Sequence, residues 1–179
     1  MGRRSTFPRR AADFYPTPVE ALRPLVPHLP RAGTYAEPCV GDGALVRGMA
    51  AVAPGWQCVA TSDLHCPVRP RSAALVRLPE GVDAAITNPP WPAPGQRGEP
   101  VLGIIHNLAA QAPTWLLLPW TFAAARYFAG VSHLCTDVLP IGRVSWMGNG
   151  VPSKDDAAWF RFEARARRRA TALHARVAA

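Results

Sequence analysis

Residues 36–43 read Ala36-Glu-Pro-Cys-Val-Gly-Asp-Gly43, and this stretch decides the fold. It begins within an apolar run at 34–40 that predicts a strand, and it leads into a run at 44–52 that predicts a helix. Glycines at such a turn let the backbone approach a ligand closely, and the start of the helix offers free N–H groups. The stretch therefore predicts the strand, turn and helix that open an α/β fold.

A second strand is predicted over 57–64, and Asp63 lies at its end. An acidic side chain in this place can accept hydrogen bonds from a ribose diol. A dinucleotide-binding fingerprint would have a third glycine where this chain has Val46. A purely structural turn needs the same glycines, so the turn alone leaves both a cofactor site and a structural role open.

The rest of the chain alternates between short apolar segments and helix-like segments, which is typical of an α/β fold. The connections after 57–64 are short, so we expect trimmed crossover helices. The last two strands are expected to form an antiparallel pair at the sheet edge. The remaining predicted strands are 73–78, 83–87, 114–119, 135–144 and 157–163, and the predicted helices are 18–29, 101–112 and 121–129.

The chain has the length and apolar content of one domain, with 179 residues of which 49% are hydrophobic. No apolar run approaches the roughly 20 residues of a membrane-spanning helix, and the N-terminus has no apolar signal core. We therefore expect a cytoplasmic protein without a membrane partner. The four cysteines are far apart and form no CxxC pair, so no metal site is expected.

The formal net charge is +8, and the arginines gather at the two ends of the chain. We expect a flexible basic arm over 1–12, a single domain over 13–163 and an arginine-rich tail over 164–179 that forms a frayed helix. Basic ends suit a phosphate-bearing partner such as a nucleic acid. The alternative is a solvated arginine-rich surface that binds nothing.

The second informative stretch is Asn88-Pro-Pro-Trp91, which ends the strand predicted at 83–87. Taken alone, a proline turn followed by a packing tryptophan explains it. Its position changes this interpretation, because the carboxyl end of a central parallel strand faces the ligand crevice of an open α/β sheet. The stretch is therefore a candidate catalytic loop.

Three stretches together resemble a known family. Glu37-Pro-Cys-Val-Gly-Asp-Gly43 resembles the cofactor motif of class I S-adenosylmethionine-dependent methyltransferases, and Asn88-Pro-Pro-Trp91 resembles the catalytic motif of their amino-methyltransferase group. Asp13-Phe-Tyr-Pro-Thr-Pro18 resembles the segment that closes over the cofactor in adenine-N6 DNA methyltransferases. The resemblance implies a Rossmann-like fold with a mostly parallel seven-stranded sheet and an antiparallel edge.

The resemblance also implies S-adenosyl-L-methionine as the cofactor. Glu37 would contact its methionine amino group, Thr17 its carboxylate and Asp63 its ribose hydroxyls. For the adenine amine the family often has an aspartate after the third strand, where this chain has Leu78-Pro-Glu80. The complete cofactor set that the resemblance implies is Tyr15, Thr17, Glu37, Pro38, Gly41, Gly43, Asp63, Leu64 and Asn88.

The catalytic role implied for the loop is to make an exocyclic amine more tetrahedral. The Asn88 side-chain oxygen and the Pro89 carbonyl would each accept a hydrogen bond from the amine. The prolines, Pro90 included, would hold that carbonyl in place. Trp91 would stack on a flipped base. Trp146 is the candidate for a second aromatic contact, although packing on the sheet explains it equally well. The implied substrate contacts are Trp91, Trp146 and Lys154.

The leading substrate is adenine N6 in DNA, because the segment at 13–18 directly precedes the core. The same loop serves enzymes that act on RNA base amines, either adenine N6 or guanine N2, and on a protein glutamine. A separate recognition or restriction partner is possible, since little of the chain after Pro119 is left for target recognition. The alternative outside enzymes is a catalytically silent nucleic-acid-binding protein on the same scaffold.

Overall fold

The structure is a computed structural model that describes residues 15–92, 97–98, 100–166 and 170–176. The basic arm predicted over 1–12 and much of the loop at 93–99 lie outside the described residues. The same holds for residues 167–169 and 177–179 of the predicted arginine-rich tail.

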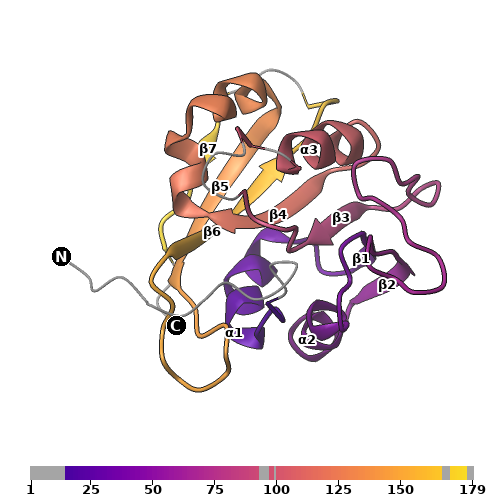
Figure 1. The fold of residues 1–179 in the computed structure, drawn as a ribbon, viewed down its shortest axis with the longest axis horizontal. Helices are drawn as coiled ribbons and strands as arrows, with labels where there is room; N and C mark the ends of the chain where they lie inside the picture. Colours follow the sequence, from indigo (N-terminus) through magenta and orange to yellow (C-terminus); the bar gives the residue numbers. More distant parts are fainter. Residues whose placement is uncertain (1–14, 93–96, 99, 167–169, 177–179) are drawn as a thin grey trace.

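A seven-stranded sheet forms the centre of the molecule, in the order β2-β1-β3-β4-β6-β5-β7 (Figure 1). The first four strands in this order run parallel, and β6 is antiparallel to both β4 and β5. This confirms the predicted α/β fold with a mostly parallel sheet. The strands are β1 (Gly33–Glu37), β2 (Trp56–Thr61), β3 (Ala84–Thr87), β4 (Thr114–Pro119), β5 (Cys135–Arg143), β6 (Asp156–Phe162) and β7 (Ala172–Leu173).

Helices cover both faces of the sheet, so that the fold has three layers (Figure 1). On one face lie α1 (Val19–Leu22) and α2 (Ala44–Val52), and on the other lies α3 (Val101–Ala109). Strand β4 is buried on both sides because its side chains alternate between the layers. Trp115 and Leu117 join the core under α1 and α2, whereas Leu116 and Leu118 join the core under α3.

Several expected helices are replaced by 3₁₀ turns. The segment predicted as a helix over 18–29 is shortened to α1 and continues as 3₁₀ turns over Arg23–His28, which contain both Pro24 and Pro27. The helix predicted over 121–129 is wrong, because that segment forms two 3₁₀ pieces, Trp120–Ala124 and Arg126–Gly130. A further 3₁₀ turn, Ser132–Leu134, leads into β5.

The strand predicted over 73–78 is wrong. Leu75 and Val76 both donate their N–H groups to the Ser72 carbonyl, which makes a turn. Helix α3 holds this segment in place of a neighbouring strand: Asn107 donates to the carbonyls of Ala73 and Val76, each at 2.9 Å. Within the described residues β2 is therefore an outer strand of the sheet, and no crossover helix lies between β2 and β3.

The C-terminal segment also differs from its prediction. In place of a frayed helix, its described residues form β7, which pairs parallel with β5. The predicted antiparallel pair, β5 with β6, is confirmed, but β7 makes the outer edge. The sheet thus continues beyond residue 163, where the sequence suggested that the domain ends.

Candidate active site

The parallel pairing of β1 with β3 brings the two informative stretches of sequence together. Tyr35 lies opposite Ala84 and Ala36 opposite Ala85, so both strands end at the same edge of the sheet. Glu37 is the last residue of β1, and Asn88 directly follows β3. Ligands of open α/β sheets bind at this carboxyl edge.

Glu37 is a buried carboxyl group with one oxygen unpaired. Its side chain is 1% exposed, and its Oε1 accepts hydrogen bonds from the Thr87 hydroxyl and from the Cys39 N–H. Its Oε2 is buried without a hydrogen-bond partner among the described residues. Burial raises the pKa of Glu37 to about 8, against the opposing effect of its two hydrogen bonds. An unpaired buried oxygen is costly, and a cationic ligand would satisfy it.

The glycine turn has the backbone geometry that its sequence requires. Gly41 has a φ of 51° and Gly43 a φ of 78°, both in the left-handed region that glycine favours. The Asp42 carboxylate accepts from the Ala44 N–H at 2.9 Å at the start of α2. Pro38 before the turn is buried. The turn thus exposes its backbone at the edge of the sheet where β1 ends.

Asp63 ties the end of β2 to this turn. Its Oδ2 accepts from the Gly41 N–H at 2.9 Å, and its Oδ1 accepts from the His65 N–H at 2.7 Å. The carboxylate is therefore held in one orientation beside the glycine turn, and each oxygen keeps a further lone pair. The next side chain, Leu64, is 58% exposed, so an apolar surface adjoins the carboxylate.

The segment before α1 reaches the candidate catalytic loop. The Asn88 Nδ2 atom donates to the Thr17 hydroxyl at 3.2 Å and to the Tyr15 carbonyl at 3.4 Å. Thr17 is 6% exposed, so this contact is shielded from water. The structure thus brings Asn88 to Tyr15 and Thr17, although it is more than 70 residues from both in sequence.

Trp91 is anchored to the sheet by its ring nitrogen. The indole N–H donates to the Leu117 carbonyl at 2.9 Å, and Trp146 packs against Trp91 with centroids 5.4 Å apart and planes at 89°. The two rings meet edge to face, so they do not form a parallel pair open to a base. Pro89 between Asn88 and Trp91 is buried and Pro90 is exposed.

The loop at 145–156 carries the remaining predicted contact. The Ser145 N–H donates to the Glu20 carboxylate at 2.6 Å, which fastens the start of this loop to α1. Lys154 is exposed near its end, and it has no hydrogen bond or ion pair within the described part of the chain. Within the described residues, no hydrogen bond or ion pair joins Lys154 to the other predicted site residues.

Three residues that sequence reasoning missed belong to this edge. Thr87 holds the Glu37 carboxyl group, and Glu20 holds the 145–156 loop. Trp120 follows β4 directly and is 39% exposed. Only Thr87 had a signal in the sequence, since it precedes Asn88 at the end of a buried strand.

The fold matches known structures at low sequence identity. A type I restriction-modification methyltransferase subunit from Streptococcus thermophilus is 12% identical over 86% of this chain and 44% of its own, with a TM-score of 0.52. A putative class I S-adenosylmethionine-dependent methyltransferase from Listeria monocytogenes is 11% identical over 87% and 62%, with a TM-score of 0.52. A dimethyladenosine transferase from Plasmodium falciparum is 14% identical over 83% and 62%, with a TM-score of 0.53.

The chain has the class I methyltransferase fold. It spans less than two thirds of the length of each of these three structures. Neither a family model nor a curated protein matches its sequence.

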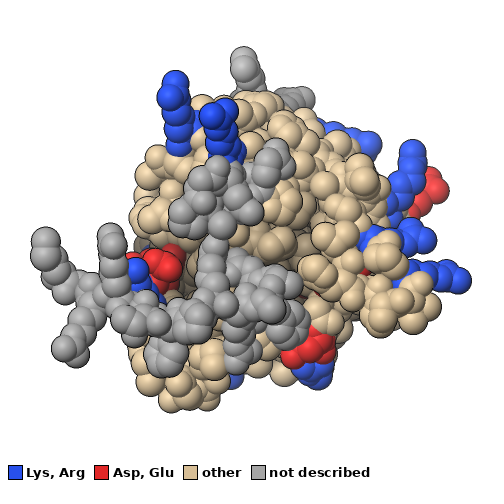
Figure 2. All heavy atoms as spheres, viewed as in Figure 1, with Lys and Arg blue, Asp and Glu red and all other residues tan. Residues whose placement is uncertain are grey.

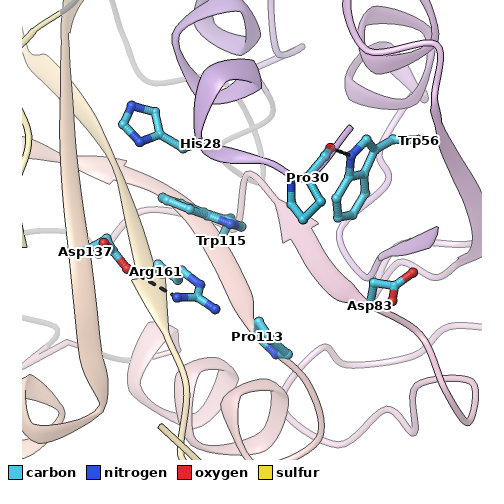
Figure 3. A pocket seen from close by; sticks show the side chains of 8 residues that line it. All are labelled: His28, Pro30, Trp56, Asp83, Pro113, Trp115, Asp137 and Arg161. Atoms are coloured by element: carbon cyan, nitrogen blue, oxygen red, sulfur yellow. Dashed lines mark hydrogen bonds and ion pairs between the residues drawn. The ribbon is translucent and has the colours of Figure 1, made fainter. Parts of the chain in front are cut away.

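At the opposite edge of the methyltransferase fold lies a hollow of about 410 Å³ (Figure 3). Two of the residues that line it, Arg161 and Asp137, contact each other at 3.4 Å. Beside the hollow, Glu163 contacts Arg161 at 2.8 Å and His174 contacts Asp137 at 3.0 Å. Burial and the neighbouring His174 lower the pKa of His28. This cluster fastens the segment that carries β7 to β5 and so has a structural role.

The described residues contain no group of three histidine, cysteine or acidic side chains that could hold a metal ion. Across the same residues, no helix of the methyltransferase fold is long and apolar enough to cross a membrane.

Proposed function

We propose that this chain transfers a methyl group from S-adenosyl-L-methionine to an exocyclic amino group, with adenine N6 in DNA as the substrate. One observation carries the proposal. The unpaired, buried Oε2 of Glu37 and the amide of Asn88 lie at the ends of adjacent parallel strands, joined through Thr87. We infer that this buried carboxyl group binds a cation beside the side-chain amide of Asn88.

The residues at this edge fit the cofactor. Glu37 would accept a hydrogen bond from the ammonium group of the methionine moiety, and Thr17 would donate one to its carboxylate. Asp63 would accept hydrogen bonds from the ribose hydroxyls. The backbone around Gly41 and Gly43 would lie along the ligand, flanked by Tyr15, Pro38 and Leu64. When bound, the cofactor supplies a methyl group activated by a positively charged sulfur.

Asn88 and Pro89 would act on the target amine. The Asn88 nitrogen donates to Tyr15 and Thr17, so its oxygen is the atom left to accept from the substrate. With the Pro89 carbonyl as the second acceptor, the amine would become more tetrahedral and its lone pair would point outward. Hydrogen-bond acceptors fixed in place do this without a strong base.

Aromatic side chains would hold the target base. Trp91 and Trp146 lie together at the catalytic edge, and the exposed Trp120 follows β4 at the same edge. An adenine turned out of its helix stacks on such rings. We propose that Lys154 contacts the phosphate backbone beside it.

The charge of the protein supports a nucleic acid as substrate. Arg69, Arg71 and Arg77 are exposed on the segment between β2 and β3, and Figure 2 shows basic side chains projecting from that side. Two structural neighbours with TM-scores of 0.52, the Streptococcus methyltransferase subunit and the type IIG restriction endonuclease BpuSI, belong by their names to restriction systems. We propose a catalytic domain that begins near residue 13 and includes β7, with a recognition partner supplying further target contacts.

Methyl transfer to four substrate classes tests the proposal. Labelled cofactor is incubated with duplex DNA, single-stranded DNA, RNA and a protein lysate, and the products are identified by nucleoside and peptide mass spectrometry. Asn88→Ala is the catalytic variant, and Gln57→Ala, at an exposed amide near the start of β2, is the matched amide control. We expect N6-methyladenine in DNA from the wild type and from Gln57→Ala, and none from Asn88→Ala.

Other outcomes are equally decisive. If the label appears in RNA or protein and its transfer requires Asn88, the proposed chemistry stands and the proposed substrate is wrong. Cofactor binding without transfer to any substrate would favour a silent binding protein or a missing partner. No binding of S-adenosyl-L-methionine by calorimetry would refute the cofactor assignment.

A further inference from the structure

The contacts of Thr17 point to a role beyond holding the cofactor. We propose that Thr17 is a positioning residue that fixes the orientation of the Asn88 amide and couples this orientation to the cofactor's carboxylate. The inference rests on the proposed function, because it assigns the Asn88 oxygen to the target amine.

The direction of the Asn88 amide follows from its neighbours. The Tyr15 carbonyl is 3.4 Å from Nδ2 and can only accept a hydrogen bond. If the amide were turned over, its oxygen would face this carbonyl, and two acceptors repel. The nitrogen must therefore point toward the N-terminal segment, and the oxygen must point away from it.

This direction also decides what the Thr17 hydroxyl does. Its oxygen lies 3.2 Å from the same Nδ2 and accepts the second amide hydrogen. A hydroxyl has one proton to donate and two lone pairs, so accepting from Asn88 leaves the proton for another acceptor. Because Thr17 is 6% exposed, bulk water has little access to the hydroxyl, and an acceptor within the site suits it best.

A carboxylate in that position would strengthen the whole chain of bonds. A hydroxyl that donates to an anion becomes a better acceptor, so the bond from Asn88 to Thr17 tightens when the carboxylate is present. The catalytic amide is then held most firmly when the methyl donor is bound. The coupling runs both ways, because loss of Asn88 weakens the grip of Thr17 on the carboxylate.

Thr17→Val removes the hydroxyl and keeps the shape of the side chain, while Thr17→Ser keeps the hydroxyl. The control is Thr136→Val, another buried threonine with one hydrogen bond, to the Arg161 carbonyl at 3.4 Å. We expect Thr17→Val to raise the Kd for S-adenosyl-L-methionine roughly 10-fold, as for a lost bond to a charged group. At saturating cofactor its kcat should still fall by about 10- to 100-fold, because the amide is misplaced.

The pattern across variants separates positioning from binding. Thr17→Ser should recover both values to within about 3-fold, and Thr136→Val should match the wild type. A Thr17→Val enzyme with normal kcat at saturating cofactor would reduce Thr17 to a binding residue and overturn the proposal. So would a folded Thr17→Ser variant that recovers neither value.

A binding cycle tests the coupling without any transfer reaction. Calorimetry measures the Kd of S-adenosyl-L-methionine for wild type, Thr17→Val, Asn88→Ala and the double variant. We expect the double variant to bind no more weakly than Thr17→Val alone, and multiplicative effects of the two substitutions would refute the coupling. If no substrate is methylated but this cycle is non-additive, the proposed function fails while the link between Thr17 and Asn88 stands.

Discussion

Glu37 is a side chain whose burial is unfavourable for folding and for which we propose a role in cofactor binding. Its carboxyl group is 1% exposed, one of its oxygens has no partner among the described residues, and burial raises its pKa to about 8. The ordinary value for this group is 4.5. Between these two pH values the folded protein holds a proton that the unfolded chain has lost.

Glu37→Gln should remove a specific pH dependence of stability. In the wild type, the free energy of unfolding contributed by Glu37 falls as pH rises from about 4.5 to about 8, because the unfolded chain binds fewer protons in this window. The amide cannot ionise, so the variant should gain stability relative to wild type as pH increases. Urea unfolding at pH 5, 6.5 and 8 measures the difference, and a constant difference across these pH values would contradict the prediction.

Trp91 is a second residue whose contacts allow a sharp test. Trp91→Phe removes the bond to the Leu117 carbonyl but keeps a ring, so it should lower the free energy of unfolding by about 1 kcal/mol. DNA affinity should stay within a few-fold of the wild type. Trp91→Ala should in addition lose stacking of ~1–3 kcal/mol. Fluorescence of 2-aminopurine at the target position reports the stacking, and equal signals from both variants would exclude it.

At the scale of elements, the segment between β2 and β3 depends on two amide side chains of α3 or just beyond it. Asn107 donates to Ala73 and Val76, and Gln111 donates to Val76 at 3.1 Å while accepting from the Leu78 N–H at 2.9 Å. These bonds satisfy backbone groups that would otherwise need a neighbouring strand.

Asn107→Ala should therefore loosen this segment. Loss of two hydrogen bonds to backbone carbonyls should cost about 1–3 kcal/mol of unfolding free energy and speed amide exchange over 72–83. The exposed neighbour His106→Ala is the control on the same helix. Exchange that remains as slow as in the wild type would show that other contacts hold the segment.

The sequence predicted the elements whose signals are local and missed those set by distant contacts. Strand β4 lies at its predicted 114–119 because five consecutive buried residues are bounded by prolines. The run at 73–78 has similar composition, yet Leu75 is 84% exposed and the backbone is taken up by Asn107 and Gln111. No sequence pattern near residue 75 indicates that Asn107 and Gln111 bind this segment. β7 was not predicted because a strand of two residues is too short to show a hydrophobic periodicity.

The same division holds for the site. Glu37 lies within the strand predicted at 34–40, and Asn88 directly follows the strand predicted at 83–87. Parallel pairing of the two strands therefore predicts that these residues lie near the same edge. The edge-to-face contact of Trp91 with Trp146 depends on how the 145–156 loop returns to α1 through Glu20, 125 residues from Ser145. No local pattern encodes that distance.

At the scale of the molecule, the sheet separates two kinds of cluster. The carboxyl edge carries the unpaired oxygen of Glu37 and the exposed Trp120, whereas the opposite edge carries charges that bind each other. The proposed binding residues and the charged cluster that holds β7 thus lie at different ends of the strands.

Ending the chain at Ala170 should affect stability and leave catalysis intact. It removes the bond from Thr171 to the Cys135 carbonyl at 2.9 Å, the bond from the His174 N–H to the Val138 carbonyl at 2.9 Å, and the contact of His174 with Asp137. We expect about 2 kcal/mol less unfolding free energy and an unchanged Kd for S-adenosyl-L-methionine. Weaker cofactor binding by the folded truncated chain would show that the two edges are coupled.

Phosphate contacts should make DNA binding depend on salt. Each phosphate that an arginine neutralises adds about 0.9 to the negative slope of log K against log salt. Replacing Arg69, Arg71 and Arg77 with alanine should make that slope shallower by roughly 1 for each one that contacts DNA. Fluorescence anisotropy from 50 to about 300 mM salt measures it, with Arg126→Ala on the far side of β4 as a single-charge comparison. An unchanged slope would show that these three arginines do not contact DNA phosphates.

The path of the chain after β7 bears on the design of fusion proteins. β7 runs parallel to β5, and the guanidinium of Arg176 lies against Gly142, one residue before β5 ends at Arg143. The described chain therefore runs from the start of β5 back toward the edge where Asn88 lies. A targeting module attached behind Arg176 would start on the side of the candidate active site, so a short flexible tether should be enough to reach it.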